Sequence, residues 1–184
     1  MNLPNFFSIV RIVLIIPFSL LLFYQQYRWA FVIFLLASVS DALDGLLARM
    51  LRQRTPLGAF LDPAADKLLI VTAFLVLSFL KLLPSWLAAI VIGRDLMICL
   101  GLAILSRASI SLEIRPSFAG KVTTALQLGS VMITLLVASG FSLVFLKDWF
   151  FWGAATATVV SGIQYFRKGI RAFAMRKRSF GRAR

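Results

Sequence analysis

Long apolar runs separated by short polar turns constrain this 184-residue chain more than any other feature. A run of roughly 20 apolar residues is long enough to cross the hydrocarbon core of a bilayer as a helix. Hydrophobic residues make up 60% of the chain, and a single core of this size cannot shelter so much apolar surface from water. We therefore predict an all-α integral membrane protein with six transmembrane helices, at residues 5–24, 29–51, 57–80, 84–106, 117–140 and 147–166.

The chain carries a large excess of positive charge, with 20 Lys and Arg residues, 7 Asp and Glu residues and a formal net charge of +13. Basic residues collect in the cytoplasmic loops of membrane proteins, and here they gather on the side that holds both chain ends, so both termini are predicted to be cytoplasmic. We divide the chain into a six-helix transmembrane domain (1–166) and a basic cytoplasmic tail (167–184). The tail is expected to rest on anionic membrane lipids and not to bind nucleic acid, because few aromatic residues are interleaved with its charges.

The residue types that the chain lacks narrow its chemistry. It has no histidine and one cysteine. This composition excludes a Ser-His-Asp triad, a histidine-ligated metal site and an intramolecular disulfide. Any catalysis must therefore rest on Asp, Lys, Arg, hydroxyl groups and metal ions.

Four of the seven acidic residues lie in one stretch. Asp41 and Asp44 are three positions apart near the end of the second predicted helix, and Asp62 and Asp66 are four positions apart near the start of the third. Residues at these spacings share one face of a helix. The short turn between the two helices is expected to make them antiparallel neighbours, so the four carboxylates are predicted to converge. The alternative is that these acids form ion pairs with the basic residues near them, Arg49, Arg52, Arg54 and Lys67.

Four carboxylates at membrane depth repel one another unless cations neutralise them. Carboxylate oxygens are the ligands that Mg²⁺ and Mn²⁺ prefer, and two such ions form a clamp for phosphoryl-type transfer. We therefore predict two divalent cations, Mg²⁺ or Mn²⁺, as cofactors of the four aspartates. Three small residues beside the acids leave room for a flat base and a diphosphate, and Arg49 is placed to bind a phosphate oxygen. The small residues are Gly45, Ala48 and Gly58.

This stretch also resembles a known family signature. It reads Asp41-x2-Asp44-Gly45-x2-Ala48-Arg49-x8-Gly58-x3-Asp62-x3-Asp66, which is similar to the signature of the CDP-alcohol phosphatidyltransferases, with every position present. Pro4, Asn5 and Arg11 extend the likeness into the first predicted helix. The resemblance implies an enzyme that transfers a phosphatidyl group from CDP-diacylglycerol to an alcohol and releases CMP.

The resemblance implies roles for individual residues. Asp66 would be the general base that deprotonates the acceptor hydroxyl, and it would share the metal ions with Asp41, Asp44 and Asp62. The CDP pocket would be lined by Asn5, Gly45, Ala48, Arg49 and Gly58. Because members of the family are commonly dimers, we expect a homodimer. We place it in the bacterial inner membrane with its active site on the cytoplasmic side.

The acceptor alcohol is sought near the cytoplasmic ends of the fourth and fifth predicted helices. The candidates for binding an anionic acceptor are Arg94, Arg115, Lys121 and Thr124. Arg94 lies deep in its predicted span, where it either faces a polar cavity or pairs with an aspartate.

Two branches of the family resemble this part of the chain. The run from Gly120 to Gln127 is similar to phosphatidylglycerophosphate synthases, whose acceptor is glycerol 3-phosphate. The longer run that starts at Arg115 is also similar to the CMP-forming cardiolipin synthases, whose acceptor is phosphatidylglycerol. Glycerol 3-phosphate is our first candidate and phosphatidylglycerol the alternative.

An ion-coupled membrane transporter is the rival class, because membrane carboxylates often mark ion pathways. Many transporters are built from related helices in two halves of the chain. Here the four acids occur in one stretch and the second half of the sequence has no counterpart. The pattern therefore favours the enzyme.

Overall fold

The structure is a computed structural model. It describes the backbone of residues 3–50, 56–107 and 118–181 and the side chains of residues 9–40, 64–101, 104 and 119–170. Those ranges contain six α-helices and no strand. The helices are α1 (Leu3–Phe23), α2 (Tyr27–Met50), α3 (Pro56–Phe79), α4 (Ser85–Arg107), α5 (Phe118–Ala138) and α6 (Val144–Gly181). The prediction of an all-α chain with six helices is confirmed for these residues.

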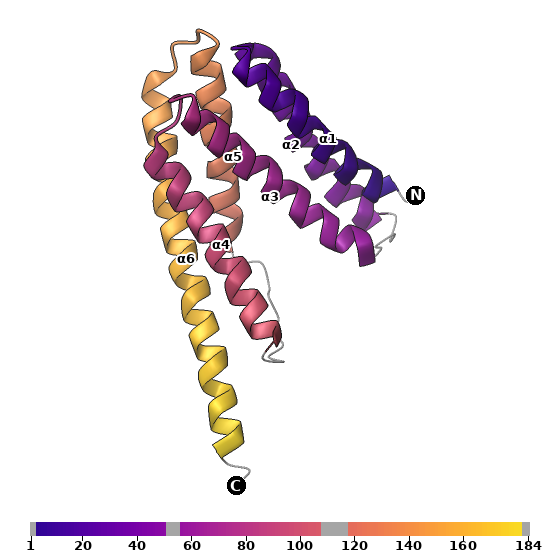
Figure 1. Ribbon diagram of the computed structural model, residues 1–184, viewed down its shortest axis with the longest axis vertical. Helices are drawn as coiled ribbons and strands as arrows, with labels where there is room; N and C mark the ends of the chain where they lie inside the picture. The colour runs from indigo at the N-terminus through magenta and orange to yellow at the C-terminus, as the bar shows by residue number, and fades with distance from the viewer. Residues whose placement is uncertain (1–2, 51–55, 108–117, 182–184) are drawn as a thin grey trace.

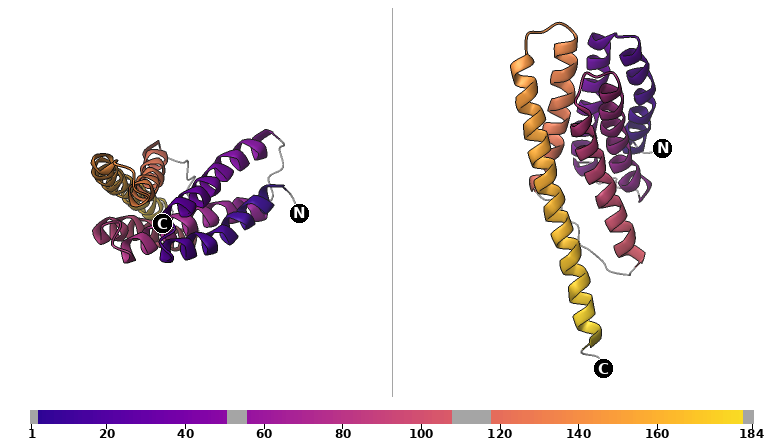
Figure 2. Two further views of the ribbon diagram at one scale, coloured as in Figure 1. Left: turned by 90° about the horizontal axis from the view of Figure 1, so that it is seen from above. Right: turned by 60° about the vertical axis from the view of Figure 1, so that its left-hand side comes forward.

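The helices alternate in direction and form two neighbouring sets (Figures 1 and 2). In one set α1 packs against α2 and α3, and in the other α6 packs against α4 and α5. Contacts of α2 with α5, and of α3 with α4 and α5, join the two sets. The starts of α1, α3 and α5 and the ends of α2, α4 and α6 lie toward the lower end in Figure 1. This is the end that the sequence predicts to be cytoplasmic.

The first helix lies between the two helices that carry the four aspartates. Over the described residues, α1 is the main packing partner of both α2 and α3. The short turn led us to expect α2 and α3 to be direct neighbours, whereas the structure joins them chiefly through α1. A residue on α1 can therefore take part in a site built on α2 and α3.

Residues in the left-handed backbone region mark the turns at the opposite end. Gln25 has a φ of 57° between α1 and α2, and Lys81 has a φ of 58° between α3 and α4. Gly140 has a φ of 100°, a conformation that ends a helix and that glycine adopts without steric cost. The fifth helix therefore ends at Ala138, slightly before the predicted end at residue 140. Pro56 begins α3, a position that suits proline because its fixed φ is helical and the missing N–H would have no partner there.

The sixth helix is longer than the sequence led us to expect. It begins at Val144 and continues to Gly181, whereas the apolar run predicted residues 147–166. Lys, Arg, Ala and Met favour helix, so the backbone stays helical where the apolar run stops. Part of the predicted basic tail is therefore a continuation of α6. The division of the chain into a domain and a tail stays a prediction.

The buried apolar core occupies the end of the bundle next to the three turns. The rings of Phe18 on α1 and Phe34 on α2 lie 5.5 Å apart at their centroids. Leu77 on α3 and Leu87 on α4 are fully buried in the same cluster, which also includes residues of α5 and α6. Toward the other end, the buried side chains include the charged residues Arg11 and Asp95. The fold thus separates an apolar half from a half that contains charge.

One helical segment in the described ranges, Ala119–Ala138, is long and apolar enough by itself to cross a membrane. Ile9–Phe23 and Tyr27–Ser40 are shorter apolar helices. The prediction that all six helices span the membrane stays a prediction.

Candidate active site

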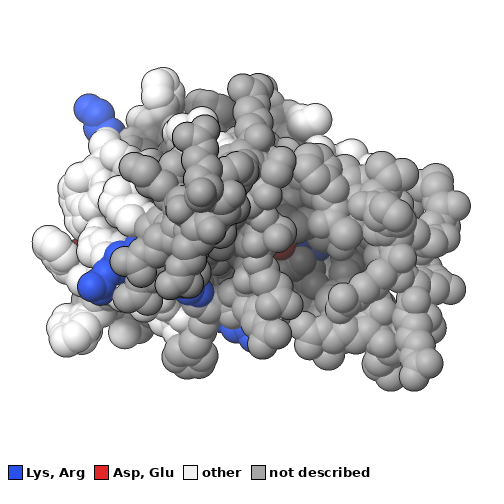
Figure 3. Space-filling view, turned by 90° about the horizontal axis from the view of Figure 1, so that it is seen from below, with Lys and Arg blue, Asp and Glu red and all other residues white. Residues whose placement is uncertain are grey.

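The candidate site lies at the end of the bundle where the sequence predicts the cytoplasm. Figure 3 shows this end from below, and among the described side chains an acidic one and several Lys and Arg side chains are visible there. The described ion pairs of this region join residues of α1, α3 and α4. A buried charge is costly unless an opposite charge compensates it, so each of these charges needs a partner.

Arg11 and Asp66 form an ion pair between α1 and α3. Nη1 of Arg11 donates a hydrogen bond to Oδ1 of Asp66. The Arg11 side chain is 1% exposed, whereas that of Asp66 is 34% exposed. The carboxylate that the sequence predicts as general base is therefore held from its buried side by a cation while remaining accessible from outside.

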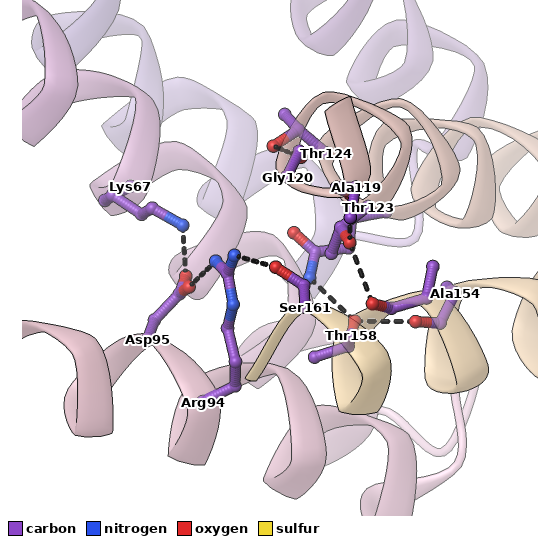
Figure 4. Close-up of polar contacts among 12 residues, drawn as sticks. Lys67, Arg94, Asp95, Ala119, Gly120, Thr123, Thr124, Ala154, Thr158 and Ser161 are labelled. Carbon is purple, nitrogen blue, oxygen red and sulfur yellow. Dashed lines mark hydrogen bonds and ion pairs between the residues drawn. The ribbon is translucent and has the colours of Figure 1, made fainter. Parts of the chain in front are cut away.

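A second cluster of charges lies between α3 and α4 (Figure 4). Nζ of Lys67 donates to Oδ2 of Asp95 at 2.6 Å, and Nη1 of Arg94 donates to Oδ1 of the same carboxylate at 2.7 Å. The Asp95 side chain is 7% exposed and that of Arg94 is 10% exposed. Arg94 therefore pairs with an aspartate, and this aspartate is its neighbour Asp95.

The same guanidinium also contacts α6. Nη2 of Arg94 donates to Oγ of Ser161 at 2.7 Å. Its Cζ lies 5.5 Å from the ring centroid of Tyr165, one helical turn further along α6. Hydrogen bonds and a cation–π contact therefore fix the plane of the Arg94 side chain.

Polar side chains of α5 face α6 next to this cluster. The Thr123 hydroxyl lies 2.8 Å from the carbonyl oxygen of Ala119 and 3.0 Å from that of Ala157. Nε2 of Gln127 donates to Oγ1 of Thr158 at 3.1 Å. These contacts hold α5 against α6 near the cation cluster (Figure 4).

Two of the predicted acceptor-binding residues lie at the start of α5. The Thr124 hydroxyl donates back to the carbonyl oxygen of Gly120 at 3.2 Å, and Lys121 is exposed. Neither makes a described contact with the cluster around Arg94. Their role in binding the acceptor stays a prediction.

Most of the signature lies outside the described side chains. The structure places Asn5 in α1, Asp41 to Arg49 in α2 and Gly58 and Asp62 in α3, all helical as predicted. Among the described side chains, no three His, Cys, Asp or Glu residues are grouped as a metal site. The residues whose side chains are not described are Asn5, Asp41, Asp44, Gly45, Ala48, Arg49, Gly58, Asp62 and Arg115.

Sequence reasoning missed the pairing of Arg11 with Asp66 and of Lys67 with Asp95. The available signal was their position, since a charged residue inside an apolar helix requires a partner in the folded bundle. Lys67 was considered as a partner for the four signature acids. In the structure it pairs with Asp95 on α4.

Comparison with known proteins defines the class of protein to which this helical bundle and its charged site belong. The family model of the CDP-alcohol phosphatidyltransferases matches residues 1–160. The chain belongs to this family and is an enzyme of phosphatidyl transfer. The resemblance predicted from the signature is thereby confirmed.

Individual relatives narrow the comparison to one branch. A CDP-diacylglycerol–glycerol-3-phosphate 3-phosphatidyltransferase of Bacillus subtilis is 33% identical over 91% of this chain and 94% of its own length. A probable phosphatidylglycerophosphate synthase of Mycobacterium tuberculosis is 35% identical over 92% of this chain and 82% of its own. A CDP-diacylglycerol–glycerol-3-phosphate 3-phosphatidyltransferase of Pseudomonas fluorescens is 47% identical, over 53% of each chain.

Proposed function

We propose that this enzyme transfers the phosphatidyl group of CDP-diacylglycerol to glycerol 3-phosphate, forming phosphatidylglycerophosphate and CMP. Two of the relatives described above name this donor and this acceptor, and the third names phosphatidylglycerophosphate as its product. The phosphoanhydride bond of the donor breaks, a phosphoester bond to the acceptor oxygen forms, and the acceptor proton must be taken up by a base.

The observation that carries the choice of an anionic acceptor is the charge balance around Arg94. The cluster contains two cations, Lys67 and Arg94, and one anion, Asp95. Arg94 also keeps a buried Nε–H that has no hydrogen-bond partner among the described residues. A guanidinium with donors to spare beside excess positive charge suits a phosphate group, and glycerol 3-phosphate supplies one.

Asp66 is proposed as the base that accepts the proton of the attacking hydroxyl. Its side chain is accessible on one side, and the ion pair with Arg11 restrains it on the other. A base must lie within hydrogen-bond reach of the proton that it removes, so this restraint favours a defined position for the carboxylate.

Members of the family generally depend on divalent cations, and the donor set of the signature fits such ions. It consists of carboxylates alone, which are hard oxygen ligands of the kind that Mg²⁺ and Mn²⁺ prefer. We propose that Asp41, Asp44, Asp62 and Asp66 hold two of these ions. When bound, the ions neutralise negative charge that develops on the departing CMP.

The CDP part of the donor is proposed to lie against the start of α3 and the end of α2. Gly45, Ala48 and Gly58 lack bulky side chains and allow close approach to the helix backbone. Arg49 is proposed to bind a phosphate oxygen, and Asn5 at the start of α1 completes the pocket.

We also propose that the six helices span a bacterial inner membrane with both termini and the active site on the cytoplasmic side. Four exposed apolar residues support a lipid-facing surface, because Ile9, Val13, Ile16 and Leu20 form one stripe along α1 at the spacing of a single helix face. Anionic lipids are proposed to contact the basic tail.

By resemblance to the family we propose a homodimer. Crosslinking in native membranes tests this oligomeric state.

The acceptor is tested with purified protein, Mg²⁺ and CDP-diacylglycerol, supplied separately with glycerol 3-phosphate and with phosphatidylglycerol. We expect CMP release and phosphatidylglycerophosphate, identified by mass spectrometry, with the first acceptor only. Asp66→Asn should abolish turnover and leave the helical content unchanged. Cardiolipin as the product would replace the proposed acceptor with phosphatidylglycerol, and full turnover by Asp66→Asn would refute the assignment of the base.

A further inference from the structure

Two successive residues of α3 are held from different sides of that helix. Asp66 pairs with Arg11 of α1, and Lys67 pairs with Asp95 of α4. Successive residues of an α-helix point about 100° apart. The turn of α3 that carries the proposed base therefore has a partner in each of two neighbouring helices, which limits both its rotation and its sliding.

Asp95 is the residue through which the second restraint acts. Both of its carboxylate oxygens are used, Oδ2 by Lys67 at 2.6 Å and Oδ1 by Arg94 at 2.7 Å. Its side chain is 7% exposed, and a buried carboxylate is strongly unfavourable unless cations compensate it. Because the two cations come from α3 and α4, the carboxylate links these helices.

The link extends to α6 through Arg94. That guanidinium is held by Asp95 on one side and by Ser161, at 2.7 Å, on the other. One buried carboxylate thus connects Lys67, which follows Asp66 on α3, with Ser161 on α6 (Figure 4). Tyr165, which also contacts Arg94, lies on the same part of α6. In a bundle with largely apolar helix surfaces, such a chain of charge-assisted hydrogen bonds defines the relative position of the helices.

We infer that Asp95 is a positioning residue of the transferase, which fixes the α3 turn of Asp66 through Lys67 and the orientation of Arg94 directly. The inference rests on the proposed function, because it assigns Asp66 and Arg94 their roles. Asp95 itself contacts no substrate in this scheme. It acts on the rate only through the two side chains that it holds.

The variant Asp95→Asn removes the charge and keeps the size. The amide presents an NH₂ group to one of the two cations, so Lys67 and Arg94 lie close together without a counter-charge. Small misplacements of catalytic groups lower rates by about 10- to 100-fold, and we expect kcat to fall within this range. The KM for CDP-diacylglycerol should stay within about twofold, because the proposed CDP pocket lies elsewhere, on α1, α2 and the start of α3.

Rescue by charge separates positioning from general destabilisation. Asp95→Glu retains the carboxylate. It should recover at least about a third of the decrease in log kcat that Asp95→Asn causes. The matched control is Asp148→Asn at the start of α6, an exposed acid near the opposite end, which should keep wild-type kinetics. Wild-type kcat in Asp95→Asn would overturn the inference, as would a rise in the donor KM that accounts for the whole loss.

If Asp95→Asn does not fold, Lys67→Gln tests the same link from the other side. It should lower kcat by about 10-fold with an unchanged donor KM, and wild-type kcat would overturn the inference. Where Asp95→Asn folds, thermal unfolding of both single variants and of the double variant gives a readout that does not depend on activity. If Lys67 and Asp95 are coupled, the double variant should lose clearly less stability than the two single variants lose in total. Additive losses would contradict the link.

These outcomes are distinguishable from failure of the proposed function. The acceptor is judged on the wild-type protein alone, and the variants are then compared with wild type using whichever acceptor supports CMP release. Should no acceptor do so, the proposed function fails, while the unfolding experiment still decides whether Lys67 and Asp95 are coupled.

Discussion

Arg11, which is almost completely buried in α1, pairs with Asp66 on α3, 55 positions later in the chain. A buried guanidinium needs an opposite charge beside it, so the bundle requires an anion at this point. The anion that satisfies it is the carboxylate proposed to act as the base. Stability of the fold and placement of a reactive group therefore depend on the same contact.

Replacing Arg11 by Met is expected to lower both the stability of the fold and the rate of turnover. Removal of one partner from a buried ion pair destabilises proteins by about 3–5 kcal/mol. Because the Asp66 side chain is 34% exposed, we expect the lower part of that range or less. Turnover should fall about 100-fold, measured as CMP release next to thermal unfolding in detergent. Arg28→Met, an exposed arginine in α2 near the opposite end, is the control, and equal effects of the two variants would contradict a specific role for Arg11.

Ser161→Ala tests the orientation of Arg94 without changing any charge. It removes the hydroxyl that accepts from Nη2 at 2.7 Å, a bond to a charged group that contributes about 1.5–3 kcal/mol. We expect the KM for glycerol 3-phosphate to rise about 3- to 10-fold with little change in the KM for CDP-diacylglycerol. Ser19→Ala is the matched control, since that hydroxyl only donates to a carbonyl of its own helix. An equal rise in both KM values would refute the assignment of Arg94 to the acceptor.

Gly129→Ala is expected to disturb the packing of α5 on α6. A Cβ atom at this position would lie 2.2 Å from Cε1 of Phe150, so the ring or the helix must move. Overpacking of this kind costs about 1–3 kcal/mol, which thermal unfolding detects as a lower midpoint. Gly93→Ala on α4 is the control, because a Cβ there meets nothing within 4 Å and alanine favours helix by about 1 kcal/mol. An unchanged unfolding midpoint in Gly129→Ala would contradict this prediction, because it would mean that the Phe150 ring moves aside at no cost in stability.

Removal of divalent cations is expected to stop turnover without unfolding the bundle. Treatment with a chelator should abolish CMP release, and Mg²⁺ or Mn²⁺ should restore it, because carboxylates are the proposed ligands. Helical content measured by circular dichroism should change little, since the buried core lies at the other end of the molecule. Full activity in excess chelator would exclude the proposed metal centre.

The helical architecture was largely predictable from local features. Apolar runs of membrane-spanning length, interrupted by Pro56 and by polar turns, indicated six helices with ends close to those observed. The end of α6 was predicted wrongly because the criterion was hydropathy. The basic residues that follow the apolar run favour helix as well, and α6 continues to Gly181.

The candidate site was predictable only in part. The spacing of the four aspartates and the small residues between them was sufficient to identify the family, which the match over residues 1–160 confirms. The same spacing did not reveal that Arg11 pairs with Asp66 or that Lys67 pairs with Asp95. Each of these charges lies inside a predicted helix, and the sequence does not reveal which other helix supplies its counter-ion.

The sequence by itself therefore determined the helices, the family and the residues with the capacity for chemistry, because these depend on composition and on short spacings along the chain. Only the tertiary structure decided which charges meet. It places α1 against both α2 and α3 and pairs residues that are 55, 28 and 67 positions apart. The physical reason is that a buried charge must find its partner in space, and helix packing decides which residues are near enough to provide it.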